Sequence, residues 1–538
     1  MLQKTSIVGD IEKNFKIIEK SYKKCVEKNC DFFLTTELFL TGYPPQDLIL
    51  RNDFLKKILL FKKKIQNLTN KKKTILVLNI PEKRNGKIFN SLFLFKNGSV
   101  IFKKNKSILP NYGVFDEKRY FSVEANKEPL FQYKNKKIKF LICEEMWSKD
   151  YILKNKKKAD LIICINASPF EINKFEKRKE YAAQNVKFFK SDLIYINYVG
   201  CQDELIFDGG SFFMNREGVI LHQGDFFKES EIIIEPSKIN KVKTNLSYIS
   251  KMETIYLALM YSLKNYMKNN NFKKVVIGLS GGIDSALCLM LSADVVASKD
   301  LDCFYLPTTY NSKQSLLDAK NLVRNLEIEM KIFPIESLRK KIISDLNPFF
   351  NNLKNDITEE NIQSRIRGLL LMAISNKFNS LLITTGNKSE LAVGYSTLYG
   401  DMCGGFSLIK DLYKTQVIEL VKWRNNNIPK FCKIKKIKII PDNIILKDPS
   451  AELKDNQRDE DSLPKYSILD KILELLIDKN YDLKSIKKYG FNEKLIKKVW
   501  KMIKNSEFKR YQSSIGPKLS DMSFDKDRRF PITNKFLI

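Results

Sequence analysis

The sequence predicts an α/β protein of two domains, a layered first domain and a second domain built on a doubly wound parallel sheet. Its 538 residues exceed what one hydrophobic core ordinarily fills. Short apolar segments alternate with helix-like segments in both halves of the chain. A stretch of uneven Lys and Asn content follows Ile234. We therefore expect domains at 1–240 and 241–538.

Six apolar segments predict strands in the first domain. Helix-like stretches lie between several of them, for example at 10–28 and 171–190. Asp-Gly-Gly at 208–210 and Asn-Arg-Glu-Gly at 215–218 are typical of turns and indicate a strand pair. The six predicted strands cover residues 31–35, 74–80, 91–95, 138–143, 161–166 and 193–199.

The second domain is expected to open with an amphipathic helix at about 248–268. Strands at 274–279, 303–307 and 380–384 follow, with helices between them. Strand–helix alternation at this spacing is typical of a parallel sheet, in which ligands bind beyond the carboxyl ends of the strands. The segments after these strands are therefore where a ligand is expected.

The formal net charge of +32 suggests nucleic acid or an acidic membrane as a partner. However, the lysine runs at 71–73 and 156–158 are scattered and not interleaved with aromatic residues, which favours a compositional bias on solvated faces. No run approaches the ~20 apolar residues that span a bilayer, and no apolar signal region opens the chain. We expect a cytoplasmic protein with no membrane partner and no specific nucleic-acid partner.

The residue inventory excludes several kinds of site. His222 is the only histidine, so imidazole clusters for a metal cannot form. The nine cysteines include no C-x-x-C pair and are spread through apolar segments, which argues against a zinc site or a disulfide framework. Acid–base chemistry is therefore expected from carboxylates and lysines.

The segment 273–290 is the most informative part of the second domain. An apolar strand runs into a turn of small residues and then a helix, so backbone N–H groups can meet an anion. Asp284 would repel phosphate unless Mg²⁺ lay between them. Its Ser-Gly-Gly-Ile-Asp-Ser motif resembles the loop of the N-type ATP pyrophosphatases, which cleave ATP between the α and β phosphates. That resemblance implies an ATP-binding loop of Gly278, Leu279, Ser280, Gly281, Gly282, Ile283, Asp284 and Ser285.

This loop alone leaves NAD, GMP and asparagine synthetases and tRNA-modifying enzymes open. Asn361 and Arg365 lie four residues apart, on one face of a predicted helix. Glu390 lies beyond the carboxyl end of a predicted strand, and Asp401 and Lys414 follow it. Acids near such a loop can hold Mg²⁺, and cations can offset charge on phosphorus.

As an ordered set, these residues resemble the NAD synthetases. The resemblance implies that Thr385, Lys414 and Ser450 contact ATP and that Asp284 and Glu390 serve Mg²⁺. It also implies a deamido-NAD site formed by Asn361, Arg365, Glu390, Tyr395, Ser396, Thr397, Leu398, Asp401 and Lys509.

The first domain offers a nucleophile that needs no histidine. Glu37 follows the predicted strand at 31–35, and Cys143 ends the one at 138–143. A cysteine at a strand end can point into a cleft, where a neighbouring lysine favours its thiolate. Lys106 could be that neighbour, and Glu37 could take the thiol proton.

These residues resemble the nitrilase (carbon–nitrogen hydrolase) superfamily over roughly residues 1–235, with its signatures at 37–45, 106–112 and 143–147. The resemblance implies a nitrilase-like αββα sandwich in which Glu37 is the base, Lys106 stabilises the oxyanion and Cys143 forms a thioester. Residues matching positions around glutamine are Tyr112, Ser168, Lys174 and the auxiliary carboxylate Glu117.

Together the two domains resemble the glutamine-dependent NAD⁺ synthetases. This implies a Rossmann-like second domain of the adenine nucleotide α-hydrolase type and a ligase that amidates deamido-NAD⁺ with ATP, Mg²⁺ and ammonia from glutamine. It also implies an ammonia tunnel and a homo-oligomer paired through the synthetase domains. The chain departs from the family pattern in a shortened first strand and in Thr36, where proline is common. Rival hypotheses are an amidotransferase that makes GMP or asparagine, a basic tRNA-modifying protein and an ammonia-only synthetase.

Overall fold

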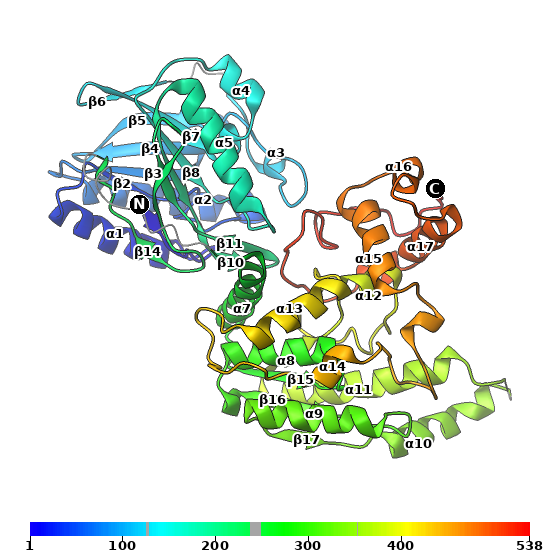
Figure 1. The fold of residues 1–538 in the computed structure, drawn as a ribbon. Coiled ribbons are helices and arrows are strands. Elements are labelled where there is room, and N and C mark those ends of the chain that lie inside the picture. Colours follow the sequence, from blue (N-terminus) through cyan, green and yellow to red (C-terminus); the bar gives the residue numbers. More distant parts are fainter. Residues whose placement is uncertain (125–128, 237–248, 352) are drawn as a thin grey trace. The chain divides into compact units, whose positions relative to one another are not determined.

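The computed structural model describes residues 1–124, 129–236, 249–351 and 353–538. The chain divides into two compact units, Met1–Ile249 and Ser250–Ile538, each with its own sheets and core (Figure 1). The predicted boundary at 240/241 lies outside the described residues. Among the described helices, none is long and apolar enough to cross a membrane.

Two main sheets form the first unit. Its strands are β1 (Leu2–Gln3), β2 (Phe32–Leu34), β3 (Ile75–Arg84), β4 (Lys87–Lys96), β5 (Ser99–Asn105), β6 (Phe131–Tyr133), β7 (Lys136–Ile142), β8 (Leu161–Asn166), β9 (Asp192–Asn197), β10 (Val199–Gln202), β11 (Leu205–Asp208), β12 (Phe212–Met214), β13 (Ile220–Gln223) and β14 (Ser230–Glu231). One sheet has the order β2-β3-β4-β5 and the other β13-β12-β9-β8-β7-β6. The strands β7, β8 and β9 run parallel at the centre of the second sheet. Short antiparallel pairs, β1 with β14 and β10 with β11, complete the unit.

The first unit is an αββα sandwich, as predicted. Side chains alternate between the faces of a strand, so each sheet has an inner and an outer apolar face. On the inner faces, Leu34 and Val77 of one sheet share a core with Phe140 and Ile163 of the other. Residues of α1 and α2 cover the outer face of the first sheet, and residues of α5 cover that of the second. The helices are α1 (Ile11–Glu27), η1 (Gln46–Leu50), α2 (Asn52–Leu68), α3 (Glu117–Tyr120), η2 (Cys143–Met146), α4 (Lys149–Lys154) and α5 (Lys174–Phe189).

The predicted strands of this unit correspond to β2, β3, β4, β7, β8 and β9, with two corrections at their ends. Cys143 does not end a strand, because β7 stops at Ile142 and Cys143 opens the turn η2. The segment predicted as one strand at 193–199 breaks at Tyr198, where β9 gives way to β10. The predicted turn at 215–218 joins the hairpin of β12 and β13. The sequence analysis missed β5 and β6, edge strands with several exposed side chains.

The second unit is built on a five-stranded parallel sheet, as predicted. Its strands are β15 (Lys274–Gly278), β16 (Leu301–Tyr305), β17 (Met330–Ile332), β18 (Ser380–Thr384) and β19 (Phe406–Ser407). The order is β17-β16-β15-β18-β19, and every neighbouring pair is parallel. The chain changes direction across the sheet between β15 and β18, which is where such sheets bind ligands. The short edge strands β17 and β19 were not predicted.

Helices cover the parallel sheet and add a separate helical layer. Val276 and Leu382 of the sheet pack against Ile362 and Ile366 of α11. A second core around Trp500 joins α12, α15 and α17. The helices are α7 (Lys251–Asn269), α8 (Ile283–Val295), η3 (Ser298–Asp300), α9 (Lys313–Leu326), α10 (Glu336–Leu346), η4 (Asn347–Phe349), α11 (Ile357–Phe378), α12 (Lys388–Val393), α13 (Lys414–Asn426), α14 (Asp442–Leu446), η5 (Asp459–Asp461), α15 (Tyr466–Leu473), η6 (Glu474–Asp478), α16 (Leu483–Lys487), α17 (Glu493–Asn505) and α18 (Glu507–Arg510).

Candidate active sites

Glu37, Lys106 and Cys143 come together in the first unit. Each directly or closely follows a strand: β2, β5 and β7 respectively. Lys106 Nζ lies 2.8 Å from Glu37 Oε1 and 2.8 Å from Glu117 Oε1. Glu37, Lys106, Glu117 and Cys143 are all buried. Charged groups this deep are stable only when they are paired, as they are here.

The electrostatics of this cluster define its resting protonation. Burial, followed by the charge of Glu37, raises the pKa of the Cys143 thiol well above its ordinary value. Burial opposes the charge on Lys106, but Glu117 and Glu37 outweigh it and raise the pKa of that ammonium. Burial also raises the pKa of Glu117 to about 7. The thiol therefore keeps its proton at neutral pH, and a base must remove it before it can attack.

The turn that carries Cys143 is fastened by Glu145, which the sequence analysis did not single out. Glu145 is fully buried, and its carboxylate accepts hydrogen bonds from the backbone N–H of Ser107 at 2.7 Å and of Ile142 at 2.8 Å. Lys104 Nζ lies 2.9 Å from the same carboxylate. Cys143 itself has φ +45°, a left-handed conformation that persists only where the surroundings impose it. In the sequence, the sign that could have pointed to this role was the second glutamate, Glu145, in the Cys-Glu-Glu run that Cys143 begins.

Two buried asparagines position Glu37. Asn90 Nδ2 donates to Glu37 Oε1 at 2.9 Å, and Asn79 Nδ2 donates to Asn90 Oδ1 at 2.7 Å. Asn79 Oδ1 accepts from the backbone N–H of Leu38 at 2.9 Å. The backbone carbonyl of Asn90 also accepts from the N–H of Lys106 at 2.8 Å. This chain of bonds fixes Glu37 and Lys106 relative to each other.

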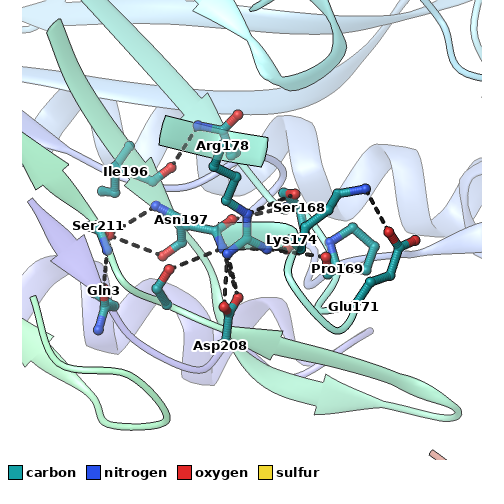
Figure 2. Close-up of polar contacts among 12 residues, drawn as sticks. Gln3, Ser168, Pro169, Glu171, Lys174, Arg178, Ile196, Asn197, Asp208 and Ser211 are labelled. Atoms are coloured by element: carbon teal, nitrogen blue, oxygen red, sulfur yellow. Dashed lines mark hydrogen bonds and ion pairs between the residues drawn. The ribbon is translucent and has the colours of Figure 1, made fainter. Parts of the chain in front are cut away.

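The loop after β8 and the first turn of α5 carry one residue each of the predicted glutamine site, Ser168 and Lys174. Figure 2 shows the Arg178 guanidinium of α5 donating to Asp208, to Ser168 Oγ at 3.3 Å and to the Ser168 carbonyl at 2.9 Å. Asn197 Oδ1 accepts from the Ser168 N–H at 2.9 Å. Lys174, the first residue of α5, pairs with Glu171 of the loop at 3.0 Å. Arg178, which is fully buried, therefore anchors the loop that carries Ser168 to α5, the helix that carries Lys174.

Tyr112 lies on the exposed side of the first-unit cluster. Its hydroxyl donates to both carboxylate oxygens of Glu144, at 3.1 and 3.0 Å. Glu144 directly follows Cys143, so Tyr112 is tied to the turn η2 that Cys143 opens. With 59% of its surface exposed, the ring is free to meet a substrate from solvent.

A cavity at the carboxyl ends of β15, β16 and β18 holds most of the residues predicted for the second domain. Six of the predicted residues do not line it: Gly281, Asn361, Arg365, Thr397, Leu398 and Lys509. Lining residues that the sequence analysis did not select include Asn311, Arg367, Lys447 and Asp459. The predicted residues that do line it are Gly278, Leu279, Ser280, Gly282, Ile283, Asp284, Ser285, Thr385, Glu390, Tyr395, Ser396, Asp401, Lys414 and Ser450.

The predicted phosphate loop is held by its own hydroxyls and by a close approach to α9. Ser285 Oγ lies 3.0 Å from Ser280 Oγ and accepts from the Ser280 N–H at 3.2 Å. Gly281 has φ +82°, and a Cβ at this position would lie 2.4 Å from the carbonyl oxygen of Ser315. Glycine is therefore required there, although Gly281 does not itself line the cavity.

Two carboxylates share one ammonium beside this loop. Lys414 Nζ is paired with Asp284 and lies 3.4 Å from Glu390 Oε1. Burial, followed by the charge of Asp284, raises the pKa of Glu390 to about 8. The negative charges of Asp284 and Glu390 oppose each other's ionisation, and a divalent cation would relieve this repulsion. Such an ion takes oxygen ligands, which carboxylates and phosphates both supply. Among the described residues, no group of three or more His, Cys, Asp or Glu forms a metal site.

Most of the residues predicted for deamido-NAD are hydrogen-bonded in separate sets that lie near one another in the chain at residues 396–398, although several of them lie outside the cavity lining. Thr397 Oγ1 donates to Asn361 Oδ1 at 2.8 Å, and Arg365 Nε donates to the Leu398 carbonyl at 3.3 Å. The Asp401 carboxylate accepts from the Thr397 N–H at 2.9 Å. Lys509 Nζ donates to the carbonyl oxygens of Ser396 at 2.7 Å and Gly394 at 2.9 Å. These bonds fasten helix α11 to the segment after α12.

Comparisons with known proteins match both units. Residues 1–243 match the carbon–nitrogen hydrolase family, and residues 255–513 match the NAD synthase family. The glutamine-dependent NAD(+) synthetase of Acinetobacter baylyi is 39% identical, over 98% of this chain and 96% of that protein. The enzyme of the same name from Thermotoga maritima is 36% identical, over 100% and 98%.

Solved structures agree with these matches. A glutamine-dependent NAD+ synthetase from Acinetobacter baumannii, in complex with ADP, has a TM-score of 0.78 and 35% identity, and the match covers 99% of this chain and 98% of that one. One from Cytophaga hutchinsonii has a TM-score of 0.82 at 21% identity, covering 98% and 96%, and supports the fold. The chain belongs to the family of glutamine-dependent NAD(+) synthetases.

Proposed function

We propose that this protein hydrolyses glutamine in its first unit and uses the ammonia in its second unit to amidate deamido-NAD⁺ to NAD⁺, with ATP cleaved to AMP and pyrophosphate. The observation that carries the proposal is the coexistence, in one chain, of a buried Glu37–Lys106 pair beside Cys143 and a cavity built around the phosphate loop. Neither feature alone distinguishes this reaction from its rivals.

In the first unit, Glu37 takes the Sγ proton as Cys143 attacks the carboxamide carbon of glutamine. Lys106 donates a hydrogen bond to the oxyanion that forms. The carbon–nitrogen bond breaks, the nitrogen receives the proton from Glu37, and ammonia leaves a glutamyl thioester. Water attacks the thioester with Glu37 again as base, and the proton returns to the thiol as glutamate departs. Tyr112, Glu117, Ser168 and Lys174 surround the glutamine.

In the second unit, a carboxylate oxygen of deamido-NAD⁺ attacks the α-phosphorus of ATP. The bond to the β-phosphate oxygen breaks, and pyrophosphate remains at residues 278–285. Ammonia then attacks the acyl carbon, AMP leaves and a proton is lost to solvent. The adenylate is needed because a free carboxylate is a poor acyl donor, whereas AMP leaves readily. Thr385, Lys414 and Ser450 hold ATP, while Glu390, Tyr395 and Asp401, with the other residues predicted for it, hold deamido-NAD⁺.

Asp284 and Glu390 are the residues that would hold Mg²⁺. When bound, the ion would offset the negative charge of the ATP phosphates. Lys414 would then be released from bridging the two carboxylates and could meet a phosphate oxygen.

We also propose a homo-oligomer formed through the second unit. Helix α11 contains the unbroken apolar run 368–374, and Leu369, which shares an exposed face with Ala373, is 69% exposed. Exposed apolar residues of this size favour an interface between copies of the chain. Sedimentation of the protein with Leu369→Glu should give a smaller species than that of the parent.

The deciding experiment compares the parent with Cys143→Ala for NAD⁺ formation from deamido-NAD⁺, ATP and Mg²⁺. We expect the parent to use glutamine or ammonium and the variant to use ammonium alone. If the folded parent makes no NAD⁺ from ammonium, the synthetase proposal is wrong. Supplying xanthosine monophosphate or aspartate instead tests the GMP and asparagine alternatives, and failure of the parent to use glutamine would favour an ammonia-only synthetase.

A further inference from the structure

Arg367 is a cation in the second-unit cavity that no motif assigned. It lies on α11 and lines the cavity together with Leu306 and Asn311. Its Nε donates to the Leu306 carbonyl at 2.9 Å, and Nη2 donates to Asn311 Oδ1 at 3.2 Å. A guanidinium has five N–H donors, so donors remain for a ligand. Among the described residues, none supplies a carboxylate in ion-pair contact with it.

The lack of an ion pair sets Arg367 apart from two fully buried arginines of the chain. Arg178 pairs with Asp208 at 2.7 Å, and Arg424 pairs with Asp294 at 3.0 Å. Burial lowers the pKa of Arg367 to about 10, against the weaker opposing effects of more distant acids. The group is still charged at neutral pH, and its desolvation is best offset by an anion inside the cavity.

A chain of contacts leads from Arg367 through Asn311 to the phosphate loop. Its partner Asn311 donates to Glu452 Oε2 at 3.2 Å, and Ser315 Oγ donates to Glu452 Oε1 at 2.7 Å. The carbonyl of Ser315 is the atom that Gly281 closely approaches. Short contacts thus connect the surroundings of Arg367 to the loop predicted to bind ATP.

Neighbours of Arg367 on α11 contact the segment predicted to bind deamido-NAD. Ser364, one turn earlier on α11, donates to Asp401 at 3.3 Å. A Cβ added at Gly368, the next residue on the helix, would lie 2.9 Å from the Gly400 carbonyl. Arg367 thus lines the same cavity as residues of both predicted substrate regions, which allows it to meet the reacting phosphate.

We propose that Arg367 binds the α-phosphate of ATP and keeps hold of it as the phosphate of AMP. The proposal rests on the function proposed above. Lys414 supplies one cation beside the phosphate loop, and the several charged oxygens of the phosphates can take a second, which Arg367 offers from the lining of the same cavity. The planar guanidinium can bind two phosphate oxygens at once and stabilise charge that develops when the carboxylate attacks.

The test compares Arg367→Met and Arg367→Lys with the parent. The first readout is deamido-NAD⁺-dependent exchange of labelled pyrophosphate into ATP, which reports adenylation without ammonia. For Arg367→Met we expect kcat/KM for ATP and the exchange rate to fall about 10- to 100-fold, as for loss of a hydrogen bond to a charged group. Arg367→Lys should recover part of this loss, because it keeps the charge without the fork. Glutamine hydrolysis should stay at the parent level.

A second readout distinguishes a contact with the phosphate of the nucleotide from a contact with its nucleoside. Arg367→Met should weaken the binding of AMP and leave the binding of adenosine unchanged. Arg324→Met, an exposed arginine on α9 bonded to Asn321, is the matched control and should change neither. Equal losses for AMP and adenosine, or unchanged exchange and AMP binding, would overturn the proposal. If the parent makes no NAD⁺ from ammonium, the proposed function itself has failed.

Discussion

The asparagine that positions Glu37 allows the first-unit geometry to be tested by one substitution, Asn90→Ala. Asn90 is 1% exposed and contacts Glu37 Oε1 at 2.9 Å and Asn79 Nδ2 at 2.7 Å. The substitution removes a hydrogen bond to a charged group, worth about 1.5–3 kcal/mol, and leaves the Asn79 amide without its acceptor, which costs about 1–3 kcal/mol. We expect the free energy of unfolding of the first unit to fall by about 3–5 kcal/mol. The freed carboxylate should also lower kcat for glutamine hydrolysis about 10- to 100-fold.

Urea unfolding and two activity assays measure these effects. Trp147 reports the first unit alone when Trp423 and Trp500 are replaced by Phe, because the chain has three tryptophans. NAD⁺ formation from ammonium should be unchanged at temperatures where the variant is folded. Asn14→Ala is the matched control, since this fully buried asparagine bonds only to the backbone of Ile7 and Leu40. The positioning argument is refuted if both variants lose stability but Asn90→Ala hydrolyses glutamine at the parent rate.

Three other substitutions test separate parts of the molecule. Gly281→Ala should abolish NAD⁺ formation from either donor but spare glutamine hydrolysis, because the new Cβ would lie 2.4 Å from a carbonyl oxygen. The control is Gly490→Ala, which should preserve both activities, because Gly490 has a similar φ of +85° but no atom within 4 Å of the added Cβ. Arg178→Met should destabilise the first unit by about 3–5 kcal/mol in urea unfolding, because it leaves the Asp208 carboxylate buried without its partner. Adding Asp208→Asn should restore part of that loss, and no recovery would contradict the reasoning. For Glu231, burial raises the pKa, but Lys4, Ser21 and Lys24 outweigh it and lower the pKa from 4.5 to about 2. The resulting stabilisation is about 1–2 kcal/mol after solvent screening. It is complete above pH 4.5 and is lost as the pH falls toward about 2. Glu231→Gln should remove this pH dependence of the urea midpoint.

Local sequence was sufficient where the chemistry depends on neighbours in the chain. The phosphate loop was predictable because strand, glycines, hydroxyls and helix follow one another within a few residues. The helix at 10–28 was predictable because Asp10 caps it and its apolar residues recur on one face, as α1 confirms. The parallel sheet followed from strand–helix alternation, and the short edge strands β17 and β19 escaped because two or three residues carry no period.

Resemblance supplied Glu37, Lys106, Cys143 and the auxiliary carboxylate Glu117, but only the tertiary structure joined them to Asn90 and Glu145. Asn90 lies on β4, and Glu145, although it shares the turn η2 with Cys143, meets Lys104 and Ser107 from another part of the chain. Strand pairing and sheet packing decide which of many buried polar side chains meet. The left-handed Cys143 is decided in the same way, because Glu145 and Lys104 hold its turn against the local preference. Arg367 shows the same limit, because the sequence places Arg365 and Arg367 only two residues apart. Only the folded cavity distinguishes Arg365, which bonds to Leu398, from Arg367, which lacks a carboxylate partner among the described residues. Sequence fixes local conformation through short-range sterics and hydrogen bonds, whereas the pairing of buried charges depends on long-range packing that no local pattern encodes.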